Sequence, residues 1–168
     1  MSGVIGVSPN MKSGEVGTYP AGHVLQVASH TASSEQSHDG SSWALKAVPL
    51  VSLILKGNKS KILVLGNISV HGGGANNVVC LDYRRAVAPV GESTVNTDNI
   101  SGEPYGLATK QTKDYWNQLH ISFLDSPNAD SGVTVSYQFV FRNYSGTTVH
   151  YLGHSSVEGV ITISEIAT

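Results

Sequence analysis

The sequence predicts an all-β protein folded as an antiparallel β-sandwich with Greek-key connections. The clearest sign is Val133–Arg142, where apolar and polar side chains alternate, because successive residues of a strand point to opposite faces of a sheet. Similar runs follow one another from His23 to Ile166, separated by turn-forming glycine, proline, asparagine and serine. No segment keeps the apolar stripe that marks an amphipathic helix. The unequal spacing of the runs favours Greek-key connections over a regular meander.

Turn chemistry separates the segments with strand patterning. Gly57–Ser60, His71–Asn77 and Asp125–Asn128 are expected to be turns or flexible loops. The carboxylate of Asp125 is expected to cap its own turn by accepting hydrogen bonds from nearby backbone N–H groups. Pro49 lacks a backbone N–H, so we expect a bend or bulge there. The expected strands are His23–Ser29, Ser42–Val48, Val51–Lys56, Ile62–Val70, Val78–Arg84, Leu119–Leu124, Val133–Arg142, Thr147–Leu152 and Val160–Ile166.

Two of these strands should lie at the centre of the fold. The first half of Ile62–Val70 is apolar on both faces, so we expect a central strand that is covered on both sides. The aromatic residues Tyr137, Phe139 and Phe141 recur at every second position, which places them in the core. Cys80 lies in an apolar run and is the only cysteine, so we expect a buried, inert thiol.

The strand pattern fades over residues 85–113, where prolines and glycines fall among polar residues. We expect a long excursion from the sandwich, and loops of this length are often functional. Lys110–Gln118 is the only helix candidate, although it lacks a sustained apolar stripe. Tyr105, Tyr115 and Trp116 lie in or beside the excursion and are candidate receptor-binding residues, since exposed Tyr and Trp suit carbohydrate stacking or protein contacts. The alternative is that they pack beneath the loop.

Composition narrows the function classes. The 168 residues suit one domain, and the net charge is −2 without any basic run, which argues against nucleic acid as a partner. No segment has the ~18 consecutive apolar residues of a membrane span, and we expect no membrane insertion. Charged residues make up 13%, against a typical value of ~25%. So few charges suggest that other copies of the chain cover part of the surface; a monomer with a surface rich in Ser, Thr and Asn is the alternative.

Residues 1–21 contain glycine or proline at short intervals, a spacing that opposes both helix and regular sheet. We expect an extended N-terminal arm, followed by a sandwich domain over residues 22–168. A free linker is usually polar, whereas apolar residues recur along this arm. It is therefore expected to dock on another protein through Val4, Ile5, Val7, Met11, Val16 and Tyr19.

The sequence offers no complete catalytic or metal constellation. His71–Gly74 resembles an oxyanion segment, and Gly153–Val157 resembles a nucleophile elbow, but Val157 stands where the elbow needs glycine and no histidine follows His154. No carboxylate pair suits a glycosidase. His150 and His154 fall on a strand and a turn, which separates them. We expect no enzyme, cofactor or metal, with one alternative left open: a trimer axis could gather three copies of one histidine.

Four segments in register carry a resemblance to a known kind of protein. Gly22–Val27 resembles a G-x-V-L-Q-V opening, and Ser60–Val64 resembles an S-S-K-I-L-V strand. Phe123–Pro127 resembles an F-L-D-S-P turn, and Val160–Ala167 resembles an I-T-L-x-E-I-A terminus. Together they resemble a domain of tail-fibre and other virion proteins from marine and cyanobacterial tailed phages. The likeness spans about residues 20–168 and is weakest over residues 71–118, so it assigns no binding residues.

The resemblance implies a homotrimeric β-sandwich of jelly-roll type in a virion assembled in the host cytoplasm. Its role would be a tail fibre, receptor-binding or adaptor protein, with the arm bound to other virion proteins and the distal loops meeting a host-surface glycan or protein. A capsid decoration trimer that braces the head is the alternative. A glycan-degrading enzyme is a third reading, which the missing acid pair disfavours.

Overall fold

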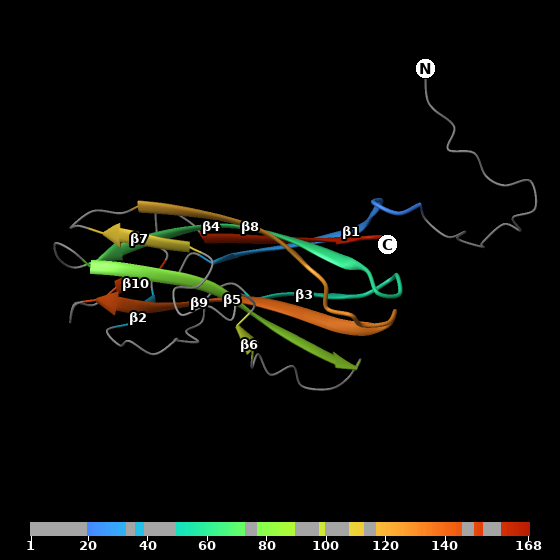
Figure 1. Cartoon of the computed structure of the whole chain (residues 1–168). Coiled ribbons are helices and arrows are strands. Elements are labelled where there is room, and N and C mark those ends of the chain that lie inside the picture. Colours follow the sequence, from blue (N-terminus) through green and yellow to red (C-terminus); the bar gives the residue numbers. More distant parts are fainter. Residues whose placement is uncertain are drawn as a thin grey trace, which may run out of the picture.

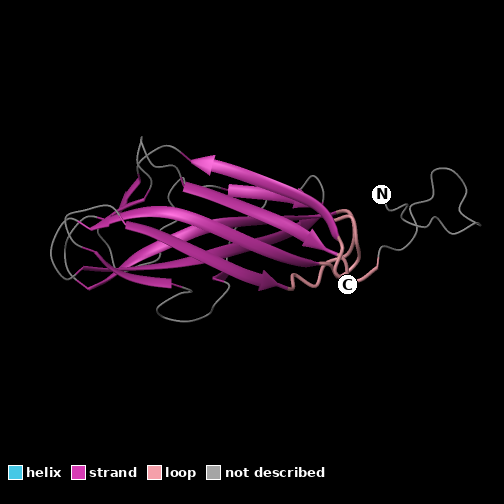
Figure 2. Cartoon of the chain, turned by 90° about the horizontal axis from the view of Figure 1, so that it is seen from above, coloured by secondary structure: helices cyan, strands magenta, loops and turns pink. Residues whose placement is uncertain are grey.

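The chain folds into two packed antiparallel β-sheets (Figures 1 and 2), which confirms the predicted fold class. The computed structural model describes residues 20–32, 36–38, 50–72, 77–89, 98–99, 108–112, 117–145, 150–152 and 159–168. None of these residues is helical. The strands are β1 (Val24–Ala32), β2 (Gln36–His38), β3 (Leu50–Ile54), β4 (Lys61–Gly72), β5 (Asn77–Pro89), β6 (Asp98–Asn99), β7 (Ala108–Thr112), β8 (Asn117–Asp125), β9 (Val133–Ser145), β10 (His150–Leu152) and β11 (Gly159–Ile166).

The strand order is that of a jelly roll. One sheet places β1, β11, β4 and β8 side by side, and β10 and β2 extend it beyond the end of β11. The other sheet places β3, β9, β5 and β7 side by side, with β6 also paired to β5. The first long strand therefore lies beside the last. Among these eight strands the chain changes sheet at every step except from β5 to β7, as a double Greek key requires.

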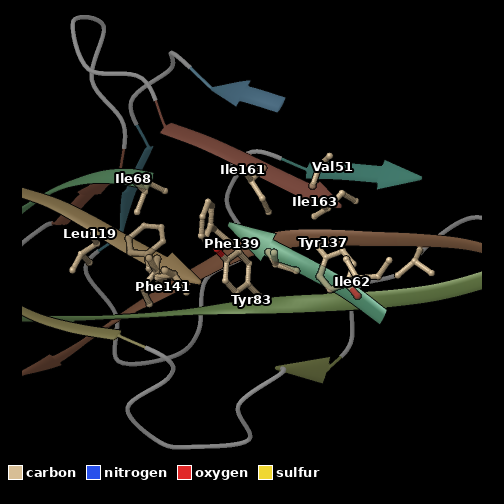
Figure 3. Packing of buried hydrophobic residues seen from close by; sticks show 14 of the residues in the cluster. Val51, Ile62, Ile68, Tyr83, Leu119, Tyr137, Phe139, Phe141, Ile161 and Ile163 are labelled. Carbon is tan, nitrogen blue, oxygen red and sulfur yellow. The ribbon is translucent and has the colours of Figure 1, made fainter. Parts of the chain in front are cut away.

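The core lies between the sheets and is dominated by aromatic and branched side chains (Figure 3). Tyr137, Phe139 and Phe141 on β9 are fully buried, as predicted. The ring of Phe139 stacks on Tyr83 of β5, with centroids 4.5 Å apart. Both rings press against Gly66 of β4, where any side chain would collide with them. The glycine is thus a packing requirement of the core.

Several boundaries differ from the sequence expectations. β5 continues past Arg84 to Pro89, paired with β9 throughout, so the predicted excursion begins later and is interrupted by β6 and β7. The one helix candidate, Lys110–Gln118, is not a helix at either end, because its two ends belong to β7 and β8. His71 and Gly72 belong to β4 and not to a loop. The expected strand Ser42–Val48 and the bend at Pro49 lie outside the described residues.

Two turns and the C-terminus meet at one end of the sandwich, here called the closed end (Figure 2). Residues 55–60 connect β3 to β4, and residues 126–132 connect β8 to β9. The turns bind each other: Lys59 N donates to Ala129 O at 2.8 Å, and Ser131 N donates to Asn58 Oδ1 at 2.9 Å. Gly22 N donates to Ala167 O at 2.8 Å. The start of β1 is therefore fixed at the same end.

Candidate functional surface

Asp125, expected to cap a turn, instead joins the two sheets. Its carboxylate accepts hydrogen bonds from Arg85 Nη1 at 2.6 and 2.8 Å and from the Tyr137 hydroxyl at 2.6 Å. Burial raises the pKa of Tyr137, and the neighbouring Asp125 charge raises it further, so the phenol remains a donor. Asp125 is only 5% exposed. The cluster therefore serves as a clamp between sheets.

Glu165 is a second buried carboxylate with a framework role. It is fully buried on β11 and accepts hydrogen bonds from Gly57 N at 2.8 Å, Lys56 N at 2.9 Å and Gln26 Nε2 at 2.6 Å. Backbone N–H groups compensate a carboxylate that has lost its water. The contacts tie β11 to β1 and to the turn that leads into β4, so this carboxylate fixes the closed end.

The cysteine and the side chains that could bind a metal are the remaining candidates for chemistry. Cys80 is fully buried, as expected, and burial raises the pKa of its thiol. Within the described ranges, no group of three His, Cys, Asp or Glu side chains could hold one metal ion. No helix in that part of the chain is long and apolar enough to cross a membrane.

The binding residues proposed from the sequence lie outside the described residues. This holds for the receptor candidates Tyr105, Tyr115 and Trp116, although Trp116 directly precedes the first residue of β8. It also holds for the whole docking set of the arm, Val4, Ile5, Val7, Met11, Val16 and Tyr19.

The most distinctive surface is the outward side of β1, β11, β4 and β8, here called the open face. Alternation turns the even-numbered residues of β11 and β8, and the odd-numbered ones of β4, outward in matched rows. Val27, Leu65 and Leu124 are 59%, 42% and 51% exposed. Around them stand Ser29, Thr31, Leu63, Asn67, His120, Ser122, Val160, Thr162, Ser164 and Ile166, and the only side chain with a permanent charge is Lys61 at one corner.

The other sheet is covered only in part on its outward side. Cys80, Asp82, Ser136 and Val140 are fully buried there, whereas Leu50 and Ile54 of β3 are 44% and 50% exposed. The first half of β4, expected to be covered on both sides, is covered on one: Ile62 and Val64 are fully buried, whereas Leu65 faces solvent. Among the described residues, the open face is thus a surface of four adjacent strands on which Val27, Leu65 and Leu124 are exposed.

A hollow of about 380 Å³ lies at the middle of the open face. The short side chains of Ser122 and Thr162 flank Leu65 there, and Asn67, His120 and Val160 complete the rim. The Oδ1 atom of Asn67 is buried and has no hydrogen-bond partner. A buried acceptor in that state carries an energetic cost.

Comparisons with known proteins yield remote structural likeness only. No family model and no curated protein matches the chain. Solved structures of infectious bursal disease virus are similar to it. The Gx strain gives 12% identity and a TM-score of 0.43, covering 99% of this chain and 41% of that chain. The VP2 subviral particle gives 14% and 0.40, covering 99% and 42%. The chain spans about two-fifths of those proteins, and likeness this remote assigns it no function.

Proposed function

We propose that the chain is a non-enzymatic structural protein of a tailed-phage virion, acting as a trimeric tail fibre or adaptor that contacts the host surface. The observation that carries the proposal is a partly apolar sheet face, charged only at the corner where Lys61 lies, that the described residues leave exposed. Soluble monomers rarely expose contiguous apolar surface. A protein built into a larger assembly has a partner for such a face.

The four segments that resemble phage virion proteins support the proposal by their position. Though dispersed along the sequence, they fall in β1, β4, β8 and β11, which are adjacent strands of one sheet. They meet at the closed end, where Ile62 pairs with both Asp125 and Glu165. The resemblance therefore follows the residues that hold the framework together, and it leaves the opposite end free to vary.

The two ends of the sandwich suggest which end faces the virion and which faces the host. The arm joins β1 at the closed end, and we propose that it binds other virion proteins there. β4 ends and β8 begins at the opposite end, where Val70 pairs with Asn117. Tyr115 and Trp116 lie in the connection that leads into β8 there, and we propose that they and Tyr105 are receptor contacts that face a host glycan or protein.

Deletion of residues 1–20 in the phage that encodes the protein tests this arrangement. The shortened protein should fold and form trimers, because its sheets and core remain, but it should be absent from purified particles. Immunogold electron microscopy of wild-type particles should label the tail. Labelling over the whole head at high copy number would instead support the decoration role, and particles free of label would contradict both.

An enzymatic role can be tested on the same protein. When the protein is incubated with purified host polysaccharide, the polysaccharide should keep its chain length and the protein should still bind it. Release of oligosaccharides would overturn the non-enzymatic assignment.

A further inference from the structure

We propose that three copies of the chain associate through their open faces, with β4 and β11 nearest a threefold axis. The inference rests on the trimer of the proposed function and assigns its contact surface. β11 and β4 are the middle strands of the face, so Thr162 and Leu65, which are paired, lie at its centre. Three copies of these uncharged side chains can meet without the repulsion that identical charges would create around an axis.

The size of the face suits such a contact. Four strands spaced by ~4.8 Å span about 19 Å, and four outward rows spaced by ~6.8 Å span about 27 Å, giving about 500 Å² before side-chain relief is added. A standard interface buries about 800 Å² per partner, which is the same order. The single permanent charge, Lys61, lies at a corner of the face, where it can stay in water.

Packing distance is compatible with threefold symmetry. Three sheets about 19 Å wide, arranged as a triangular prism, place each sheet about 5.5 Å from the axis; half the usual separation of packed sheets is about 5 Å. Outward side chains of ordinary length would therefore fill the prism. A charged or very large residue at the centre would not fit, and the two central rows of β4 and β11 hold Leu63, Leu65, Thr162 and Ser164.

Analytical ultracentrifugation of four proteins tests the interface. Leu65→Glu and Thr162→Glu each place a carboxylate at the centre of the face. Ile54→Glu is the matched control, since Ile54 is 50% exposed on the other sheet. Circular dichroism and thermal melting establish that each variant is folded. We expect trimers for the wild-type and Ile54→Glu proteins, and folded monomers for the other two at the same concentration.

The possible failures are distinguishable. A wild-type monomer would overturn the trimer and with it the proposed assembly. A trimer that survives both central substitutions would overturn the open face as the contact while leaving the trimer standing. A wild-type dimer would overturn the threefold arrangement.

Discussion

The hydroxyl of Tyr137 donates a 2.6 Å hydrogen bond to Oδ2 of Asp125, and this bond crosses from one sheet to the other. Tyr137 stands in the middle of β9, whereas Asp125 ends β8. The same carboxylate is held by Arg85 of β5. Because both ends of the bond are buried, each partner depends on the other for its hydrogen bonding.

Removing the Tyr137 hydroxyl should therefore destabilise the fold. Tyr137→Phe keeps the ring but leaves Asp125 with one fewer donor, and we expect a loss of about 1–3 kcal/mol in the free energy of unfolding. Tyr83→Phe is the matched control, because the Tyr83 hydroxyl is buried without a partner. That variant should be neutral or slightly stabilised. Urea denaturation measures both, and equal losses would contradict the clamp.

The two ion pairs near the closed end should contribute unequally to the free energy of unfolding. Lys59 and Asp130 lie 3.2 Å apart but are 54% and 67% exposed, so Asp130→Asn should change stability by less than about 1 kcal/mol. Arg85→Met removes the positive partner of the buried Asp125 carboxylate and should lower the free energy of unfolding by about 3–5 kcal/mol. Thermal melts at low and high salt compare them; a large effect of Asp130→Asn would contradict this ranking.

Glu165→Gln should weaken the closed end. The carboxylate accepts hydrogen bonds from N–H groups of Gly57, Lys56 and Gln26. The amide that replaces it would point its own N–H group at one of these donors, and that hydrogen bond would be lost. Hydrogen bonds to a charged group are worth about 1.5–3 kcal/mol each, so we expect a loss of at least that size in urea unfolding. A double-mutant cycle with Gln26→Ala should show coupling, since the two side chains touch. Additive losses would indicate that the contact carries no energy.

Gly66→Ala should be poorly tolerated. The new methyl group would collide with Phe139 and with the Tyr83 hydroxyl, and overpacking of this kind typically costs about 1–3 kcal/mol. Gly159→Ala is the milder comparison, because its methyl group would meet no atom closer than the Ile68 side chain, at 3.3 Å. Differential scanning calorimetry should show the larger fall in melting temperature for Gly66→Ala. The reverse order would contradict the packing described for the core.

Stability should fall in alkali. Burial raises the pKa of Cys80, Tyr83 and Tyr137 above their unfolded values, with help from the nearby Asp82 and Asp125 charges for the two tyrosines. The folded state therefore keeps protons that the unfolded chain releases, so stability is complete below the unfolded pKa values and declines above them. Those values are about 8.5 for cysteine and about 10 for tyrosine.

Urea midpoints measured from pH 7 to about pH 11 check this window. Cys80→Ala should remove the earliest part of the decline, and Tyr137→Phe should reduce the later part. A midpoint that stays constant to the highest pH would contradict the burial of these groups.

Alternation was sufficient to locate the two most regular strands, although β9 is buried on both sides, since Ser136 and Val140 are fully covered as well as Phe139. Val133–Arg142 and Val160–Ile166 fall within β9 and β11. The signal failed where a strand crosses polar residues: Arg85 lies within β5 because its guanidinium finds Asp125 in the other sheet. No local pattern announces a partner that is 40 residues away.

Only part of the open face could be predicted from the sequence. The two-sided apolar character of the first half of Ile62–Val70 indicated apolar residues on both sides of this strand, but not which neighbours lie beside them. Leu65, Thr162 and Ser122 come together only through the pairing of β11 and β8 with β4. Long-range register of this kind is fixed by the whole sandwich, so single segments cannot reveal it.

The seclusion of Cys80 has a practical consequence. The molecule carries a single native thiol, and that thiol is sealed in the interior with little tendency to ionise, so maleimides should not label the folded protein. A cysteine engineered at any outward position would be the lone reactive handle. Spin labels or fluorophores attached there would give unambiguous distances between neighbouring molecules, and Cys80 would not have to be replaced first.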